Sequence, residues 1–102
     1  MSDPILVVAR AQVPVENRDR FVEGARDCMA EARQEQGCLA YDMFESATTR
    51  GSFVVVGSWE TRSDIDRHMT TPHLRAFLDL AGACVLAPPV VEVVELRSVD
   101  RL

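Results

Sequence analysis

The sequence contains no lysine, an odd number of cysteines and no long apolar run. All eleven basic residues among its 102 are arginines, so a Schiff base or a lysine general base is excluded. The three cysteines form no Cys-x-x-Cys pair, which predicts free thiols and argues against a disulfide framework or a zinc site. Apolar runs such as residues 5–9 are far shorter than the ~20 residues of a membrane-spanning helix.

Basic clusters and leader-like segments are lacking as well. The arginines are interleaved with sixteen carboxylates, and the net charge is −5. A nucleic-acid partner is therefore not expected, because phosphate backbones are bound by concentrated positive charge. The N-terminal residues form neither a basic segment nor a cleavable apolar segment, so we expect a cytoplasmic chain that does not engage a membrane.

Cofactor motifs are also missing. There is no glycine-rich phosphate loop, no G-x-G-x-x-G and no G-x-S-x-G. His68 and His73 are five residues apart with Pro72 between them, which is not the i, i+4 spacing of a helical metal site. The sequence therefore predicts no cofactor and no metal.

What is present is typical of one globular domain, residues 1–102. Hydrophobic residues make up 47% and charged residues 26% of the chain, close to the averages of folded domains. Hydrophobic periodicity predicts strands over residues 5–13, 38–46, 52–60 and 90–99 and helices over residues 17–36, 61–70 and 72–85. Asn17 and Thr71 are the expected N-caps of the two longer helices.

This order, β-α-β-β-α-β, is typical of an α+β, ferredoxin-like fold with an antiparallel sheet and helices on one face. The other face of the sheet carries many apolar residues, among them Val54, Val56, Val90 and Val94. Because an uncovered apolar face indicates a partner, a symmetric dimer with face-to-face sheets is expected.

Three segments resemble a known family. They are residues 35–41 (EQGCLAY), residues 59–61 (WET) and residues 68–74 (HMTTPHL). In this order and at these spacings, the segments resemble the antibiotic biosynthesis monooxygenase family of the dimeric α+β-barrel superfamily, and the similarity spans nearly the whole chain.

The resemblance implies a homodimer whose sheets form a barrel, with a pocket in each protomer between its own sheet and helices. Some members oxidise phenols or quinols with O₂ and without metal or flavin, and others isomerise a small phosphorylated signal. Still others cleave haem with an Asn, Trp and His set. This chain has Ala9, His68 and Leu78 at those positions, so haem cleavage is not expected.

His68 is the first candidate for catalysis. On its predicted helix, Ile65, His68 and Met69 share one apolar face, so the imidazole points toward the sheet. A neutral imidazole can accept a phenolic proton as a general base. The alternative is a structural histidine bonded to a backbone carbonyl.

Trp59 is the second candidate, because it ends a strand on the same face as Val55 and Gly57. A large ring beside a glycine leaves a hollow in which an aromatic substrate could stack. The alternative is that Trp59 is simply the largest packing residue of the core.

Other residues are candidates for contact with the substrate. Tyr41 could donate its hydroxyl or expose it at the surface, and His73 could lie at the pocket mouth or on the surface. Phe53 and Phe77 could be pocket wall or core. The expected substrate-binding set is Tyr41, Phe53, Val55, Ile65, Met69, His73 and Phe77.

Three functions remain open at this point. The first is a cofactor-independent monooxygenase that oxidises a quinol or an electron-rich phenol with molecular oxygen. The second is a non-redox isomerase of a small phosphorylated metabolite, which would not need oxygen. The third is a dimer that binds a small molecule without turnover.

Overall fold

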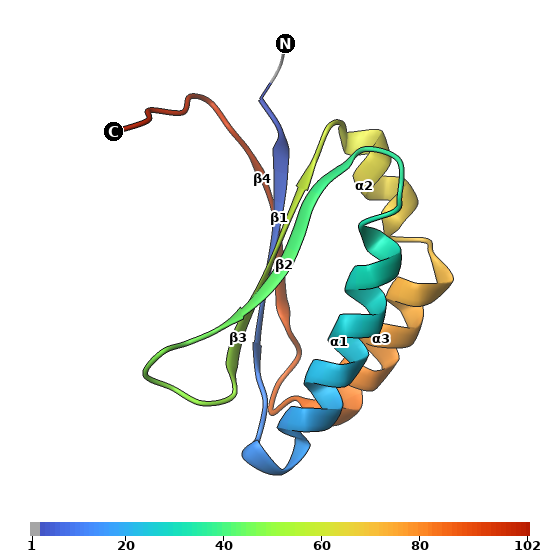
Figure 1. Ribbon diagram of the computed structural model, residues 1–102, viewed down its shortest axis with the longest axis vertical. Helices are drawn as coiled ribbons and strands as arrows, with labels where there is room; N and C mark the ends of the chain where they lie inside the picture. The colour runs from blue at the N-terminus through green and yellow to red at the C-terminus, as the bar shows by residue number, and fades with distance from the viewer. Residues whose placement is uncertain (1–2) are drawn as a thin grey trace.

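The computed structural model describes residues 3–102, and its elements follow the predicted order (Figure 1). The predicted domain includes Met1 and Ser2, which lie outside the described residues. The elements are β1 (Ile5–Gln12), the 3-10 turn η1 (Val15–Asn17), α1 (Arg18–Ala32), β2 (Cys38–Glu45), β3 (Ser52–Trp59), α2 (Arg62–His68), α3 (Pro72–Cys84) and β4 (Val90–Glu95).

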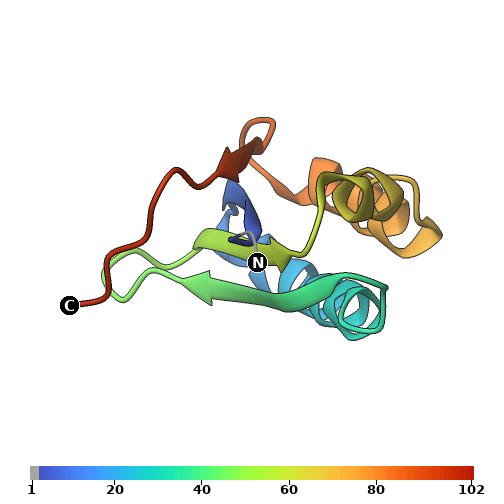
Figure 2. The ribbon, with the colours of Figure 1, turned by 90° about the horizontal axis from the view of Figure 1, so that it is seen from above.

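The four strands form one antiparallel sheet in the order β2-β3-β1-β4. The helices lie together on one face of this sheet, and the other face is open (Figures 1 and 2). Sheet order and helix placement confirm the α+β, ferredoxin-like fold. Among residues 3–102, no helix combines the length and the apolar character that crossing a membrane requires.

The core lies between the helices and the sheet and has two parts. The Phe21 cluster consists of the buried residues Val13, Phe21, Phe53, Ala81 and Cys84. The Trp59 cluster consists of the buried residues Ala32, Tyr41, Trp59 and Ile65. Helix α1 contributes to both clusters because its apolar stripe, predicted from the 3.6-residue period, faces the sheet along its whole length.

The open face of the sheet is apolar in the pattern that the sequence predicts. The register pairs Val8 with Val56, and Arg10 with both Val54 and Val90. Val90 is 57% exposed in the single chain. Arg10 and Glu92, both exposed, form an ion pair of 2.6 Å on this face.

The ends of α1 differ from the prediction, and α2 is shorter than the predicted 61–70. Asn17 occupies the N-cap position of α1, as predicted, but its side chain makes no capping hydrogen bond. Its side-chain amide instead donates to the backbone carbonyl of Cys84, 3.2 Å away. It therefore satisfies a carbonyl at the end of α3. Thr71 does cap α3, since its hydroxyl oxygen accepts from the backbone N–H of Leu74.

Helix α1 ends at Ala32, four residues earlier than residue 36, where the prediction ended it. The turn that follows reaches Gly37, whose φ of +83° favours glycine. The Gly37 carbonyl accepts from the backbone N–H of Glu60, and a β-carbon at this position would overlap the side chain of Asp64. This turn holds Glu35 outside the helix, beside α2.

Candidate functional site

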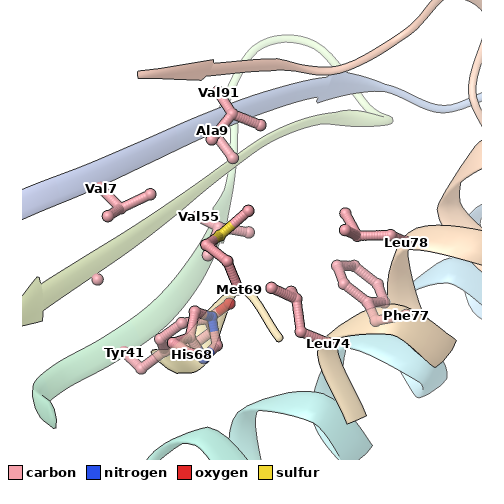
Figure 3. Close-up of a pocket in the computed structure, with 11 residues that line it drawn as sticks. Val7, Ala9, Tyr41, Val55, His68, Met69, Leu74, Phe77, Leu78 and Val91 are labelled. Carbon is pink, nitrogen blue, oxygen red and sulfur yellow. The ribbon is translucent and has the colours of Figure 1, made fainter. Parts of the chain in front are cut away.

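A cavity of about 60 Å³ lies between the sheet and helices α2 and α3 (Figure 3). Strands β1, β2, β3 and β4 supply one wall and the two helices supply the other. The lining residues are Val7, Ala9, Tyr41, Val55, Gly57, His68, Met69, Leu74, Phe77, Leu78 and Val91.

The cavity has a polar end and an open side. His68 and Tyr41 lie together at one end, away from Phe77 and Leu78 (Figure 3). Three of the lining side chains, those of Met69, Leu78 and Val91, are exposed. The entrance is therefore between β4 and the two helices.

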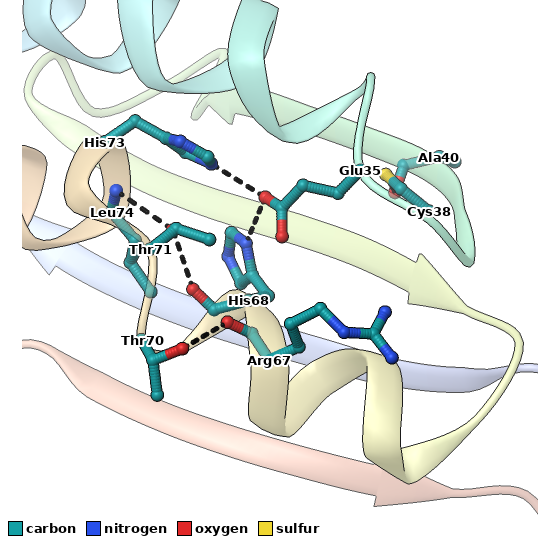
Figure 4. Close-up of polar contacts among 9 residues, drawn as sticks. All are labelled: Glu35, Cys38, Ala40, Arg67, His68, Thr70, Thr71, His73 and Leu74. Atoms are coloured by element: carbon teal, nitrogen blue, oxygen red, sulfur yellow. Dashed lines mark hydrogen bonds and ion pairs between the residues drawn. The ribbon is translucent and has the colours of Figure 1, made fainter.

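His68 is held by a carboxylate that the sequence analysis did not identify. The His68 Nδ1 atom lies 2.7 Å from Glu35 Oε2, and the His73 Nε2 atom lies 2.7 Å from the same oxygen (Figure 4). The His68 side chain is 3% exposed and that of Glu35 is 12% exposed. One shielded carboxylate thus bridges two imidazoles from different helices.

This bridge determines which nitrogen of His68 is free. An ionised carboxylate can only accept, so the Nδ1–H of His68 donates to it. The other ring nitrogen, Nε2, then carries a lone pair, and it makes no hydrogen bond within residues 3–102. Because the ring lines the cavity, Nε2 is available to a ligand there. The carboxylate also stabilises the imidazolium that would form if Nε2 took up a proton.

Trp59 packs behind the His68 ring and does not line the cavity. The Trp59 and His68 ring centroids are 4.7 Å apart, and Trp59 is completely buried. Its indole nitrogen is the one buried side-chain polar atom without a hydrogen-bond partner in the part of the chain that the structure describes. A β-carbon at Gly57 would lie 2.8 Å from that nitrogen, so glycine leaves room for the indole.

Tyr41 faces the same imidazole, with a centroid distance of 5.3 Å. Burial raises the pKa of Tyr41, and the neighbouring Cys28 thiol adds to this effect. Burial also raises the pKa of Cys28 to about 11. Both groups therefore stay protonated near neutral pH, and Tyr41 can serve as a hydrogen-bond donor but not as a base.

Glu35, His68 and His73 could also hold a divalent cation. One ligand atom each from Glu35, His68 and His73 lies within 4.8 Å of the others, and two histidines with one carboxylate are a known ligand set. The five-residue spacing of the histidines argued against such a site only on a single helix. The break at Thr71 places the two rings on different helices and lets both reach Glu35.

The structure brings many of the predicted site residues together. Tyr41, Val55, His68, Met69 and Phe77 line the cavity. Trp59 and Ile65 pack in the Trp59 cluster next to it. Phe53 lines an adjoining cavity, and His73 lines a groove between α1 and α3, on the other side of Glu35.

Glu35 is the most informative residue that the sequence analysis missed. The residue stands in one of the family-like segments, 35–41, but the helix predicted over 17–36 included it. Its position outside α1 follows from the early end of that helix. The cavity residues Leu74, Leu78 and Val91 were also missed as site residues, because apolar side chains in helices and strands give no separate signal.

Known proteins resemble this chain in sequence. Residues 4–80 match the family model described as antibiotic biosynthesis monooxygenase. The Bacillus subtilis protein named "Putative monooxygenase YcnE" is 28% identical, over 92% of this chain and 99% of its own length.

Solved structures give the same result. A crystal structure described as an antibiotic biosynthesis monooxygenase is 28% identical over 92% of this chain and 99% of its own, with a TM-score of 0.86. The structure of Rv0793 from Mycobacterium tuberculosis is also 28% identical, over 96% and 97% of the two chains, with a TM-score of 0.84.

Proposed function

Since this chain belongs to the antibiotic biosynthesis monooxygenase family, we propose that it transfers one atom of O₂ to a quinol or an electron-rich phenol without a bound cofactor. The observation that carries the proposal is the position of His68. Glu35 holds Nδ1 of the imidazole, and the ring lines a cavity whose other walls, apart from Tyr41, are apolar. An imidazole that is oriented by a carboxylate at the edge of such a cavity suits the deprotonation of a weakly acidic, hydrophobic hydroxyl compound.

The reaction begins when His68 Nε2 accepts the proton of a substrate hydroxyl. Glu35 stabilises the resulting imidazolium, and the Tyr41 hydroxyl can donate to a substrate oxygen. The phenolate is electron-rich enough to transfer one electron to O₂, which gives a carbon-centred radical and superoxide. The apolar walls exclude water and hold this pair until the C–O bond forms.

The electrons in this reaction come from the substrate alone. For 1,4-dihydroxynaphthalene, the quinol and O₂ give 2-hydroxy-1,4-naphthoquinone and water. One oxygen atom enters the ring and the other is reduced to water, while the ring loses four electrons. The His68 imidazolium returns its proton to the peroxide oxygen that leaves as water.

The lining of the cavity favours this reaction over isomerisation of a phosphorylated metabolite. A phosphate group is usually held by arginine or by backbone N–H groups at a glycine-rich loop or a helix start. The residues around the described cavity include no arginine and no such loop. A protein that binds a small molecule without turnover could have the same cavity, so turnover has to be measured directly.

The assembly in this proposal is a homodimer with the two open sheet faces packed together. Its support is the apolar open face, on which Val90, Val94 and Phe44 are exposed in the single chain. Exposed apolar patches of this kind are usually covered. Sedimentation equilibrium would show a dimer, and a monomer at micromolar concentration would contradict the assembly.

The test of the catalytic proposal is oxygen consumption by chelator-treated protein with 1,4-dihydroxynaphthalene. Under oxygen-18 gas, we expect one labelled atom in the hydroxyquinone. Replacing the base, His68→Ala, is expected to lower kcat by about 10²- to 10⁴-fold, the usual contribution of a general base.

The matched control is His73→Asn, which changes the other histidine of the network but not the cavity. We expect this variant to retain activity within a few-fold of the wild type. Oxygen consumption that gives only quinone and hydrogen peroxide would reject the proposal. An oxygenation rate that His68→Ala leaves unchanged would also reject it.

A further inference from the structure

A second cavity, of about 40 Å³, continues the first one along the sheet. The two cavities share five lining residues, which are Ala9, Val55, Phe77, Leu78 and Val91. They are therefore two lobes of one trough. The lobe that contains His68 and Tyr41 is called the polar lobe below, and the second cavity is called the distal lobe.

Strand β1 gives the direction and length of the trough. Val7 lines the polar lobe, Ala9 lines both lobes and Ala11 lines the distal lobe. These three residues alternate along one face of the strand, so they span about 13 Å. Across the sheet, Val7 pairs with Gly57 and Gly57 pairs with Tyr41, which places the polar groups at the Val7 end.

The distal lobe differs from the polar lobe in chemistry and in volume. Every residue that lines it is apolar, including Ala11, Phe21, Ala81 and Pro89. A ligand group there finds no side-chain hydrogen bond, so only hydrocarbon is favoured. The small volume fits a chain better than a second fused ring.

We propose that the substrate of this protein is a hydroxylated ring that carries an aliphatic chain, with the hydroxyl at His68 and the chain in the distal lobe. This inference rests on the proposed function for the placement of the ring. Phe77 and Leu78 lie away from His68 and Tyr41 (Figure 3) and line both lobes. The aliphatic chain of the substrate therefore sets substrate preference, and the residues of the polar lobe perform the chemistry.

Binding of 4-alkylphenols, from 4-methylphenol to 4-octylphenol, tests the proposal without any turnover. The protein has one tryptophan, Trp59. Because this residue packs on His68, its fluorescence reports occupancy of the polar lobe. We expect Kd to fall about fourfold for each added methylene until the distal lobe is full, and then to level off.

Two variants narrow the distal lobe from opposite walls, Ala11→Val on β1 and Ala81→Val on α3. Each is expected to move the levelling-off point to a shorter chain while leaving Kd for 4-methylphenol within twofold. Ala83→Val is the matched control, because Ala83 is an exposed residue on the same helix as Ala81. It should leave the whole series unchanged.

The outcomes separate this proposal from the proposed function. If Kd in the wild type does not depend on the length of the alkyl chain, the proposal that the distal lobe binds an aliphatic chain is overturned, even if neither variant folds. Equal levelling-off points in the wild type and in a folded variant also overturn it. Chain-dependent binding without oxygenation of any quinol would support the trough and reject only the monooxygenase chemistry.

Discussion

The Phe21 cluster and the Trp59 cluster occupy the two ends of the same helix-covered sheet face, but they differ in content. In the Phe21 cluster, Phe21 packs against Phe53 and Phe77 with centroid distances of 5.1 and 5.4 Å. In the Trp59 cluster, the aromatic rings surround the His68 imidazole. Apart from the Cys84 thiol, the first end is hydrocarbon, whereas the second contains a phenol hydroxyl and packs on an imidazole.

Polar atoms at the two ends also differ in how completely they are paired. Next to the Phe21 cluster, Arg18 donates two hydrogen bonds to Glu45, and Glu45 also accepts from the Gly51 N–H. Within the Trp59 cluster, the indole N–H of Trp59 lacks a partner among the described residues. Complete pairing is typical of a structural region, and an unpaired buried group often marks a functional one.

The two ends of the core of this small domain therefore serve different functions. The Phe21 cluster supplies stability, and the Trp59 cluster accepts polar groups that a purely structural core would avoid. Substitutions at the first end should therefore lower the free energy of unfolding. Changes to the polar side chains beside the second end, Glu35 and His68, should mainly affect turnover.

The largest effect is expected from Phe21→Ala. Phe21 is 2% exposed, and removing a buried phenylalanine side chain lowers the free energy of unfolding by about 3–5 kcal/mol. Urea unfolding followed by circular dichroism measures this change. A loss below about 1.5 kcal/mol would mean that the Phe21 cluster is not the main source of stability.

A smaller effect, on rate, is expected from Glu35→Gln. The amide oxygen can still accept hydrogen bonds, but the charge that stabilises the His68 imidazolium is lost. A charge-assisted hydrogen bond contributes about 1.5–3 kcal/mol, so kcat should fall about 10- to 100-fold in the oxygenation assay. Glu31→Gln, at an exposed position of α1, is the matched control and should retain the wild-type rate.

Glu35→Gln should also leave thermal stability close to that of the wild type. If Glu35 were mainly structural, Tm would fall and kcat of the folded fraction would not. That result would reject a catalytic role for the Glu35–His68 pair beside the Trp59 cluster.

The smallest effect is expected from Glu45→Gln and depends on pH. The Arg18 guanidinium lowers the pKa of Glu45 from 4.5 to about 2. Because the folded state favours the ionised carboxyl, this stabilisation is present above pH 4.5 and is lost as the pH falls toward 2. The urea midpoint of the variant should therefore be lower than that of the wild type at pH 7, and the difference should shrink as the pH falls from 4.5 toward 2. A difference that persists unchanged at pH 2.5 would contradict this assignment.

Most of the fold could be predicted from the sequence because it depends on local patterns. Period-2 alternation identified the strands, and the 3.6-residue stripe on α1 identified the face that packs on the sheet. Pro72 and its preceding threonine located the start of α3. These features depend on neighbours in the chain and did not require knowledge of distant contacts.

The helix ends and the site network depend on contacts between distant residues, and there the prediction was incomplete. Asn17 has the chemistry of an N-cap, but it bonds to Cys84, 67 residues away. Glu35 reaches histidines 33 and 38 residues further along the chain. Periodicity assigns an element to each residue but does not say which side chains meet across elements.

The turn that ends at Gly37 has a consequence for how this protein tolerates change. Any side chain at position 37 would meet Asp64 and would also have to adopt a positive φ, so a library selected only for folded protein should already be poor in substitutions there. Two residues earlier, position 35 should accept glutamine under that selection and become restricted to glutamate only when turnover is required. Two positions of one turn thus respond to different selections, one for a stable fold and one for chemistry.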